Sequence, residues 1–172
     1  ETGAEGTWVE VVGETIRVGE DDFTKPARTA LDAIEPIDPK TRPDSTKMYM
    51  IGFQDEDDAK AASLAEIGLE GRTASTMAGC IFALFGTGEY GGCLIHSPNV
   101  YDFPVSLQIA RILGGDARWV HNSEPVNFSE LWVDDRADML RLPGIVACSH
   151  DLKKIEAMCA HAKDWNPQRY EE

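Results

Sequence analysis

Apolar and polar residues alternate along the first third of the chain in a way that predicts two strands, then a strand and a helix. The β-rich segments 7–12 and 15–18 flank Gly13, and this arrangement is typical of a hairpin. A third strand is expected over 48–53. An acidic first turn followed by apolar residues at helical spacing predicts a helix over 55–67.

The clearest helix pattern follows Asp102, which occupies the expected N-cap position. Pro104 falls in the first turn, where its missing N–H costs nothing, and apolar residues recur at helical spacing over 105–113. Gly114-Gly115 ends this helix, because glycine adopts a left-handed conformation without a side-chain clash. A short strand is expected at 117–121, so Asp102 should lie at the positive end of a helix near the sheet edge where α/β proteins bind ligands.

The other apolar segments complete an α/β pattern. Residues 77–85 predict a buried helix that Gly86 ends, and a short strand follows at 93–95. Residues 140–149 predict a buried strand, and 151–159 the closing helix. The expected fold is therefore α/β, with a mixed, mainly parallel sheet and flanking helices.

Length and composition indicate one domain over residues 1–172. The chain is 42% hydrophobic and 27% charged, as in globular proteins, and 172 residues suffice for a real core. Proline-punctuated residues 19–47 predict a loop or insertion, and 165–172 a mobile tail. No apolar run approaches a membrane span and no secretory signal is present. The absence of an initial Met suggests a recombinant, processed or partial product.

The net charge of −14 argues against nucleic acid or an anionic membrane as a general partner. The four cysteines form no CxxC pair and have no histidine at zinc-like spacing. Cys80 and Cys148 lie in apolar runs and are expected to be buried. The chain is not of the cysteine-dense type that needs disulfides, so a cytoplasmic location is expected.

The Tyr101-Asp102 pair, the helix after it and Gly114-Gly115 resemble a C-terminal signature of the lithium-sensitive, Mg²⁺-dependent inositol monophosphatase superfamily. The resemblance implies that Asp102 is a metal ligand and that Mg²⁺ is the cofactor. Taken by itself, the residue pattern favours a simple helix cap, because caps are common and metal ligands are rare.

Two further blocks resemble the same superfamily in the same order. Residues 6–18 match its hairpin segment, and Ala74-Ser75-Thr76 with 86–89 match a segment whose helix start contacts the substrate. The resemblance therefore implies substrate contacts at Ala74 and Ser75 and a small phosphorylated substrate. It also implies a fold like the C-terminal half of that superfamily. Ser75 as an ordinary helix cap is the alternative.

The superfamily's principal metal motif has no full counterpart in this chain. Glu35 to Thr41 is an echo of it that follows the hairpin instead of preceding it, and the acidic run 19–22 is too short. One hypothesis is therefore the C-terminal part of a Mg²⁺-dependent phosphomonoesterase, with the other carboxylates on a protein partner, either an N-terminal half or a second copy. A second is a non-catalytic relative that serves as a binding or structural subunit. A third is an unrelated acidic α/β domain.

Overall fold

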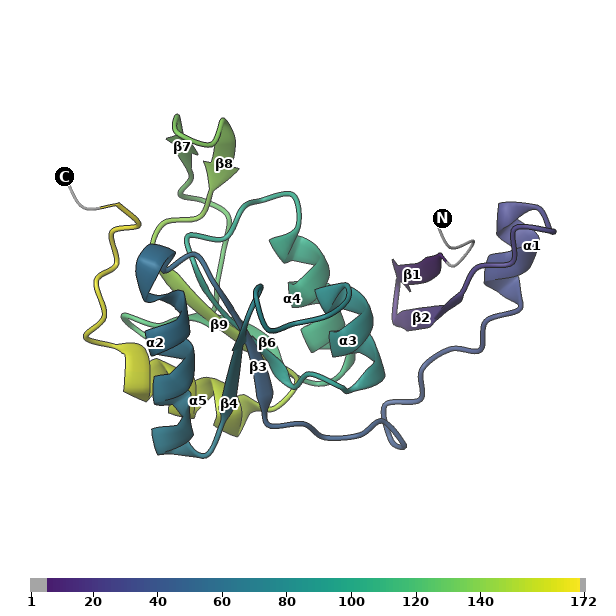
Figure 1. Ribbon diagram of the computed structural model, residues 1–172, viewed down its shortest axis with the longest axis horizontal. Helices are drawn as coiled ribbons and strands as arrows, with labels where there is room; N and C mark the ends of the chain where they lie inside the picture. Colours follow the sequence, from purple (N-terminus) through teal and green to yellow (C-terminus); the bar gives the residue numbers. More distant parts are fainter. Residues whose placement is uncertain (1–5, 171–172) are drawn as a thin grey trace.

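The computed structural model describes residues 6–170 and is built around one five-stranded sheet (Figure 1). The strand order across the sheet is β4-β3-β5-β9-β6. The bounds are β3 Lys47–Ile51, β4 Glu70–Thr73, β5 Gly92–His96, β6 Asp116–Trp119 and β9 Ile145–Ser149. β3 pairs in parallel with β4 and β5, whereas β9 is antiparallel to both of its neighbours.

The α/β class and the mixed sheet agree with the sequence prediction, but the term mainly parallel fits only in part. Four of the strands share one direction, yet two ladders are parallel and two are antiparallel. The reason is the position of β9 between β5 and β6. It enters the sheet directly from a small hairpin, β7 Trp132–Asp134 and β8 Met139–Arg141, without the crossover helix that a parallel neighbour requires.

Helices cover both faces of the sheet. The face that bears Met48, Met50 and Leu94 packs against α2 Asp57–Ser63 and α5 Leu152–Ala162. The face that bears Cys93 and Cys148 packs against α3 Ile81–Thr87 and α4 Phe103–Ile112. Short 3₁₀ turns, η1 Gln54–Glu56 and η2 Leu64–Ile67, extend α2 at its two ends and complete the helix predicted over 55–67.

A second, two-stranded sheet lies beyond α3 and α4. The predicted hairpin is present as β1 Thr7–Val12 and β2 Thr15–Glu20, and Ile16 and Val18 pack against Gly86 of α3. The short helix α1 Ala27–Asp32 follows on the far side of the hairpin (Figure 1), where Arg28 pairs with Glu10 of β1. The order of layers is α2/α5, main sheet, α3/α4, hairpin, α1.

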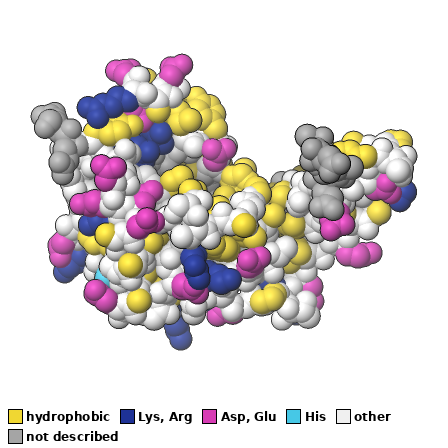
Figure 2. All heavy atoms as spheres, in the orientation of Figure 1, with side chains coloured by type: hydrophobic (Ala, Val, Ile, Leu, Met, Phe, Trp, Pro, Cys, Tyr) yellow, Lys and Arg dark blue, Asp and Glu magenta, His cyan; other side chains and the backbone are white. Residues whose placement is uncertain are grey.

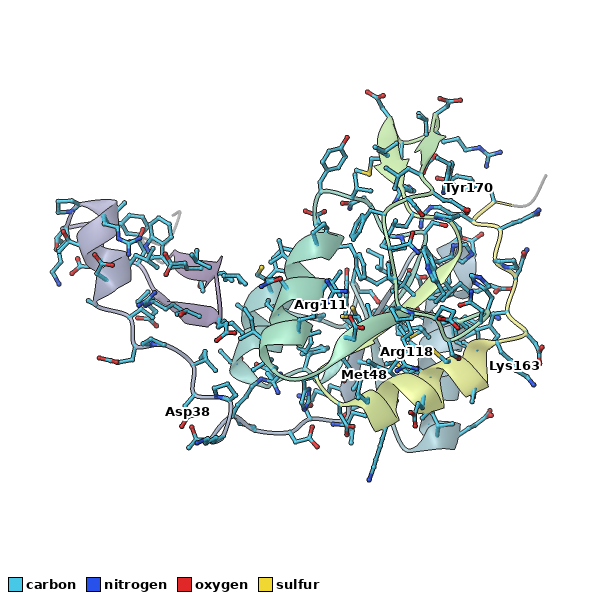
Figure 3. All side chains as sticks on the ribbon, turned by 180° about the vertical axis from the view of Figure 1, so that it is seen from behind. Asp38, Met48, Arg111, Arg118, Lys163 and Tyr170 are labelled. Carbon is cyan, nitrogen blue, oxygen red and sulfur yellow. The ribbon has the colours of Figure 1, made fainter. Side chains whose placement is uncertain are left out.

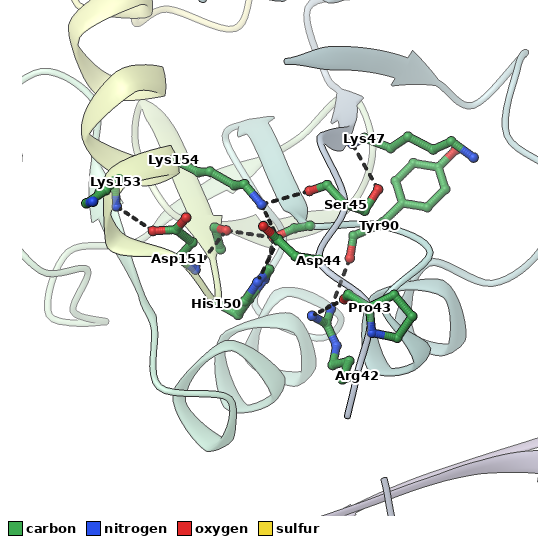
Figure 4. Close-up of polar contacts among 12 residues, drawn as sticks. Arg42, Pro43, Asp44, Ser45, Lys47, Tyr90, His150, Asp151, Lys153 and Lys154 are labelled. Carbon is green, nitrogen blue, oxygen red and sulfur yellow. Dashed lines mark hydrogen bonds and ion pairs between the residues drawn. The ribbon is translucent and has the colours of Figure 1, made fainter. Parts of the chain in front are cut away.

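The linker from α1 to β3 is fixed to the body by charged side chains (Figure 4). Arg42 donates hydrogen bonds to the carbonyl oxygen of Gly86 in the last turn of α3 and to that of Tyr90 just after the helix, both at 3.1 Å. Asp44 pairs with Lys154 of α5 and lies 3.1 Å from Nε2 of His150. The hydrogen bond from Lys154 lowers the pKa of the Asp44 carboxyl. Part of the segment predicted as a loop or insertion is therefore anchored.

Two predicted elements have different bounds in the structure. The helix expected over 77–85 begins only at Ile81, because Gly79 has a φ of +112°, and it ends at Gly88 instead of Gly86. The strand expected over 140–149 is split into β8 and β9 around Gly144, which has a φ of +79°.

The burial of the cysteines agrees only in part with the sequence prediction. Cys148 is buried as predicted, but Cys80 is exposed because it precedes α3 instead of lying within it. All four thiols are free. Within residues 6–170, no helix has both the length and the apolar character needed to cross a bilayer.

Candidate ligand-binding pocket

A cavity of about 420 Å³ lies where the carboxyl ends of β3 and β5 separate. The chain leaves β3 toward α2 on one face of the sheet and leaves β5 toward α4 on the other face. Connections that diverge in this way from neighbouring parallel strands open a crevice, which is the usual ligand site of open α/β sheets. The cavity has a volume that suits a small organic molecule.

The walls of this pocket combine apolar side chains with a few polar ones. The apolar part comes from β3, β5 and the first turns of α3 and α4, and its members include Ile51, Ile81, Phe82, Ile95 and Phe103. Hydrophobic side chains also gather in the hollow between the hairpin arm and the main body (Figure 2). The polar part is Tyr49, His96, Asn99, Asp102, Ser106, Arg141 and Arg169. Such a lining suits a ligand with an apolar body and one polar head.

Two arginines make the charge of the pocket unlike that of the whole protein. Arg141 lies on β8 with 9% of its side chain exposed, and Arg169 lies in the C-terminal segment with 14% exposed. Asp102 is the one carboxylate among the described lining residues. The lining thus has two guanidinium groups and one carboxylate in a chain whose overall charge is −14, and the buried Asp134 behind the wall balances the charge of Arg141. Guanidinium groups in a partly apolar cavity favour an anionic ligand.

Arg141 is held in place by Asp134, a fully buried carboxylate on β7. Its Nε donates to Oδ2 of Asp134 at 2.6 Å, and its Nη1 donates to the carbonyl oxygen of Ser97 at 3.1 Å. Burial by itself raises the pKa of Asp134, but hydrogen bonds from Arg141 and Tyr170 outweigh burial and lower it. The Asp134 carboxylate therefore stays charged and keeps Arg141 in one orientation.

His96 lines the pocket between β5 and the C-terminal segment. Its Nδ1 lies 3.0 Å from the hydroxyl of Ser97, and its Nε2 lies 3.0 Å from the carbonyl oxygen of Asn166. Because a carbonyl can only accept, Nε2 carries the proton and donates. Burial lowers the pKa of His96, so the ring is neutral at pH 7 and adds no charge to the pocket.

Asp102 occupies the N-cap position of α4 as predicted, but its carboxylate does not cap the helix. The residue has φ −97° and ψ −41°, which is helical geometry, and its side chain accepts no hydrogen bond from the first turn. N-cap side chains reach the first-turn N–H groups from extended backbone, which explains the difference. The carboxylate instead accepts from Nδ2 of Asn99 at 2.8 Å, at the edge of the pocket.

Ala74 and Ser75 lie apart from this pocket. Both are exposed in a turn directly after β4, not at a helix start, because α3 begins later at Ile81. The hydroxyl of Ser75 lies 2.8 Å from that of Thr73, which in turn donates to Asp58 at 2.8 Å. Neither Ala74 nor Ser75 contributes to the lining that contains Asp102.

The acidic residues considered for a metal site are dispersed in the structure. Asp38 lies on the linker, remote from Tyr170 (Figure 3) and outside the pocket lining, and its carboxylate accepts from the backbone N–H of Lys40 at 2.9 Å. Asp22 pairs with Lys25 at 2.7 Å. Residues 6–170 contain no group of three or more His, Cys, Asp or Glu side chains placed to hold a metal ion. For Mg²⁺, the described pocket therefore offers one carboxylate, that of Asp102.

Sequence reasoning did not identify Arg141, Arg169 or His96 as pocket residues. Arg141 stands within an apolar stretch, where the buried charge was an available hint. Arg169 lies in a segment whose composition predicts a tail, so nothing local indicates its position. His96 ends a buried strand, and only the strand order places it at the crevice.

Comparison with known proteins finds no matching family model, no matching curated protein and no similar solved structure. The resemblance to the inositol monophosphatase superfamily therefore receives no support from these comparisons and rests on the motifs alone.

Proposed function

We propose that this chain binds a small phosphorylated organic molecule in the pocket between β3 and β5. The observation that carries the proposal is the pair of arginines, Arg141 and Arg169, in the wall of a pocket with one carboxylate. Guanidinium groups match the geometry of phosphate oxygens and remain charged at any physiological pH. The apolar walls supply a surface for the organic part of the molecule.

Titration calorimetry with phenyl phosphate tests this proposal, because the probe has one phosphate and one apolar ring. Inorganic phosphate and phenol, which each provide half of the probe, are expected to bind more weakly. Ile81→Glu adds a negative charge at the first residue of α3 in the pocket wall and should weaken phenyl phosphate binding at least about tenfold.

The matched control is Leu152→Glu, which makes the same change of charge at the first residue of α5, at a site that is 43% exposed and outside the pocket. It should leave binding unchanged. If phenyl phosphate does not bind the wild-type chain, or if the two variants weaken it equally, the proposal is wrong.

A second candidate function is that of the C-terminal part of an inositol monophosphatase-like phosphomonoesterase, in which Asp102 holds Mg²⁺. The position of the Asp102 carboxylate favours it: the group lies at the pocket edge and has Asn99 as its hydrogen-bond partner. A single carboxylate does not fit a complete magnesium site, because the remaining ligands must come from elsewhere. This candidate therefore requires carboxylates from a protein partner.

We expect the chain by itself not to hydrolyse phosphomonoesters at an enzymatic rate, because the uncatalysed reaction is extremely slow and one carboxylate cannot assemble the catalytic metals. Phosphate release with Mg²⁺ from inositol phosphates, sugar phosphates and nucleotide 3′-phosphates measures this. Turnover that lithium inhibits would contradict the expectation and would place a complete metal site on this chain.

A protein partner is also supported by the hairpin layer. Among residues 6–170, β1 pairs only with β2, although α1 and the α3/α4 layer lie on opposite sides of this two-stranded sheet. An isolated two-stranded sheet is marginally stable, and an unpaired edge is a template for another strand. We propose that a partner strand adds to β1, and the net charge of −14 favours a distinct chain over a second copy.

Light scattering across protein and salt concentrations tests the partner proposal. A second copy would give a dimer that strengthens as salt screens the negative charge. A distinct partner predicts a monomer that associates only when that chain is added. A stable monomer whose β1 amides are already protected from hydrogen exchange would contradict both forms of the proposal.

A further inference from the structure

The C-terminal segment 165–170 does not leave the surface as a tail but crosses the carboxyl ends of β3 and β5. Nη1 of Arg169 donates to the carbonyl oxygen of His96 at 2.8 Å and to that of Gly52 at 3.3 Å. These carbonyls belong to the end of β5 and to the residue after β3, so one guanidinium bridges the two strands at the crevice. Gly52 has a φ of +93°, and a Cβ there would lie 2.5 Å from Nη1, so glycine provides the space for Arg169.

The segment has further anchors on both sides of Arg169. The ring of Trp165 meets the ring of Phe53 edge to face at 5.3 Å between centroids. The hydroxyl of Tyr170 donates to Oδ2 of the buried Asp134 at 2.9 Å, beside the β7–β8 hairpin (Figure 3). The guanidinium of Arg136 lies 4.3 Å from the centre of the Tyr170 ring.

Asp134 links the C-terminal segment to the pocket arginines. Its Oδ2 accepts from Nε of Arg141 and from the hydroxyl of Tyr170, and it lies 4.0 Å from Nε of Arg169. One buried carboxylate thus positions both pocket arginines, Arg141 directly and Arg169 through its neighbour in the chain.

Arg169 also forms the wall between two cavities. A second cavity of about 370 Å³, lined by Phe53, Lys60, Arg136 and Trp165 among others, lies on the other side of the segment. The linings of the two cavities have Arg169 and His96 in common. Within residues 6–170, the hydrogen bonds of the Arg169 guanidinium engage Nη1 and Nε, which leaves Nη2 for a ligand.

We propose that residues 165–170 form a strap that closes the ligand-binding pocket, and that Arg169 on this strap contacts the ligand's anionic group and sets the preference for anions. This inference rests on the proposed binding of a phosphorylated molecule. The strap has no helical or sheet hydrogen bonds of its own, so its docking depends on a few polar and aromatic contacts. An anion beside Arg169 adds an attraction that exists only in the docked state. By linkage, the ligand stabilises the docked strap by the same factor by which docking raises affinity.

Titration calorimetry with phenyl phosphate on the full chain tests the role of Arg169. Arg169→Gln should weaken binding about 10- to 100-fold, as expected for loss of a charged hydrogen-bond donor. Tyr170→Phe, which removes an anchor of the strap but no pocket group, should weaken binding several-fold. Lys163→Gln removes the same charge just before the strap, at an exposed site outside the pocket, and should bind like the wild type.

These measurements distinguish a failure of the strap proposal from a failure of the proposed function. If the wild type binds phenyl phosphate and Arg169→Gln binds it equally well, the strap proposal is overturned while the pocket stands. If the wild type does not bind, the proposed function itself fails.

Hydrogen exchange on the wild-type chain gives a second measurement that does not depend on a folded variant. Backbone amides over 165–170 should exchange several-fold more slowly when phenyl phosphate is present. Unchanged exchange at a saturating concentration of a bound probe would overturn the strap.

Discussion

Replacing Asp134 with asparagine tests how the β7–β8 hairpin holds the pocket together. Asp134 is fully buried, and its carboxylate accepts from Arg141 at 2.6 Å and from Tyr170 at 2.9 Å. The asparagine side chain would keep the size of the original and one acceptor oxygen but would lose the charge. The buried Arg141 would then lack its counterion.

The size of the effect follows from the geometry. Unit charges about 4 Å apart attract by about 4 kcal/mol at an effective dielectric constant of about 20. Asparagine still accepts one neutral hydrogen bond, which is worth about 1 kcal/mol, so a net loss of about 3 kcal/mol is expected. This value agrees with the loss of about 3–5 kcal/mol that is typical when one partner of a buried pair is removed.

Urea unfolding followed by circular dichroism measures the loss at pH 7. The matched control is Asp138→Asn in the same hairpin, because Asp138 is exposed and its φ of +49° is readily adopted by asparagine. The control should remain within about 0.5 kcal/mol of the wild type. Equal stability of the two variants would refute the assignment of Asp134 as the buried anchor.

The pH dependence of the same variant tests the direction in which the contribution of Asp134 to stability changes with pH. The folded-state pKa of Asp134 is below its ordinary value, so its contribution to stability is present above the unfolded pKa near 4. That contribution is lost as the pH falls through the lower folded value. The difference between wild type and Asp134→Asn should therefore be constant above about pH 5 and shrink in stronger acid.

Three further predictions concern single residues. Asp102→Asn should change the free energy of unfolding by less than about 0.5 kcal/mol, because the Asp102 carboxylate makes no capping bond. The same variant should abolish any Mg²⁺ response of an assembled enzyme, which phosphate release would measure. Burial lowers the folded-state pKa of His96, so the unfolded chain takes up the proton first and stability should fall as the pH drops below about 6.5. The urea midpoint of the wild type should decrease with pH in this range, and that of His96→Gln should decrease less. Gly115→Ala places a Cβ 2.0 Å from the carbonyl oxygen of Ser149 and should cost about 3 kcal/mol in thermal unfolding. Gly114→Ala should cost less, because its Cβ meets open space and only the φ of +93° is unfavourable for alanine.

Local patterns along the chain specify most of the secondary elements. The hairpin at Gly13, the helix after Asp102 and the closing helix after Asp151 were all predictable, because each has local turn or cap residues next to a periodic apolar pattern. Asp151 also accepts the capping bond from the N–H of Lys153 that its position suggests. The α/β class followed from the same patterns.

Long-range packing sets the sheet ladders and the pocket. The interior, antiparallel position of β9 depends on pairing with β5 and β6, which are far away in sequence and leave no local trace. The start of α3 depends on the backbone at Gly79, although the apolar spacing from Met77 to Phe85 continues across this glycine.

Arg141 and Arg169 come together through contacts between distant segments. Both lie near the buried Asp134, and Arg169 also donates to the carbonyl oxygens of His96 and Gly52. Their separation along the chain gives no spacing to detect, and the composition of 165–172 is that of a tail. The preference for anions that we propose for the pocket would therefore be a property of the fold, since burial and proximity would create it from residues that are individually ordinary in the sequence.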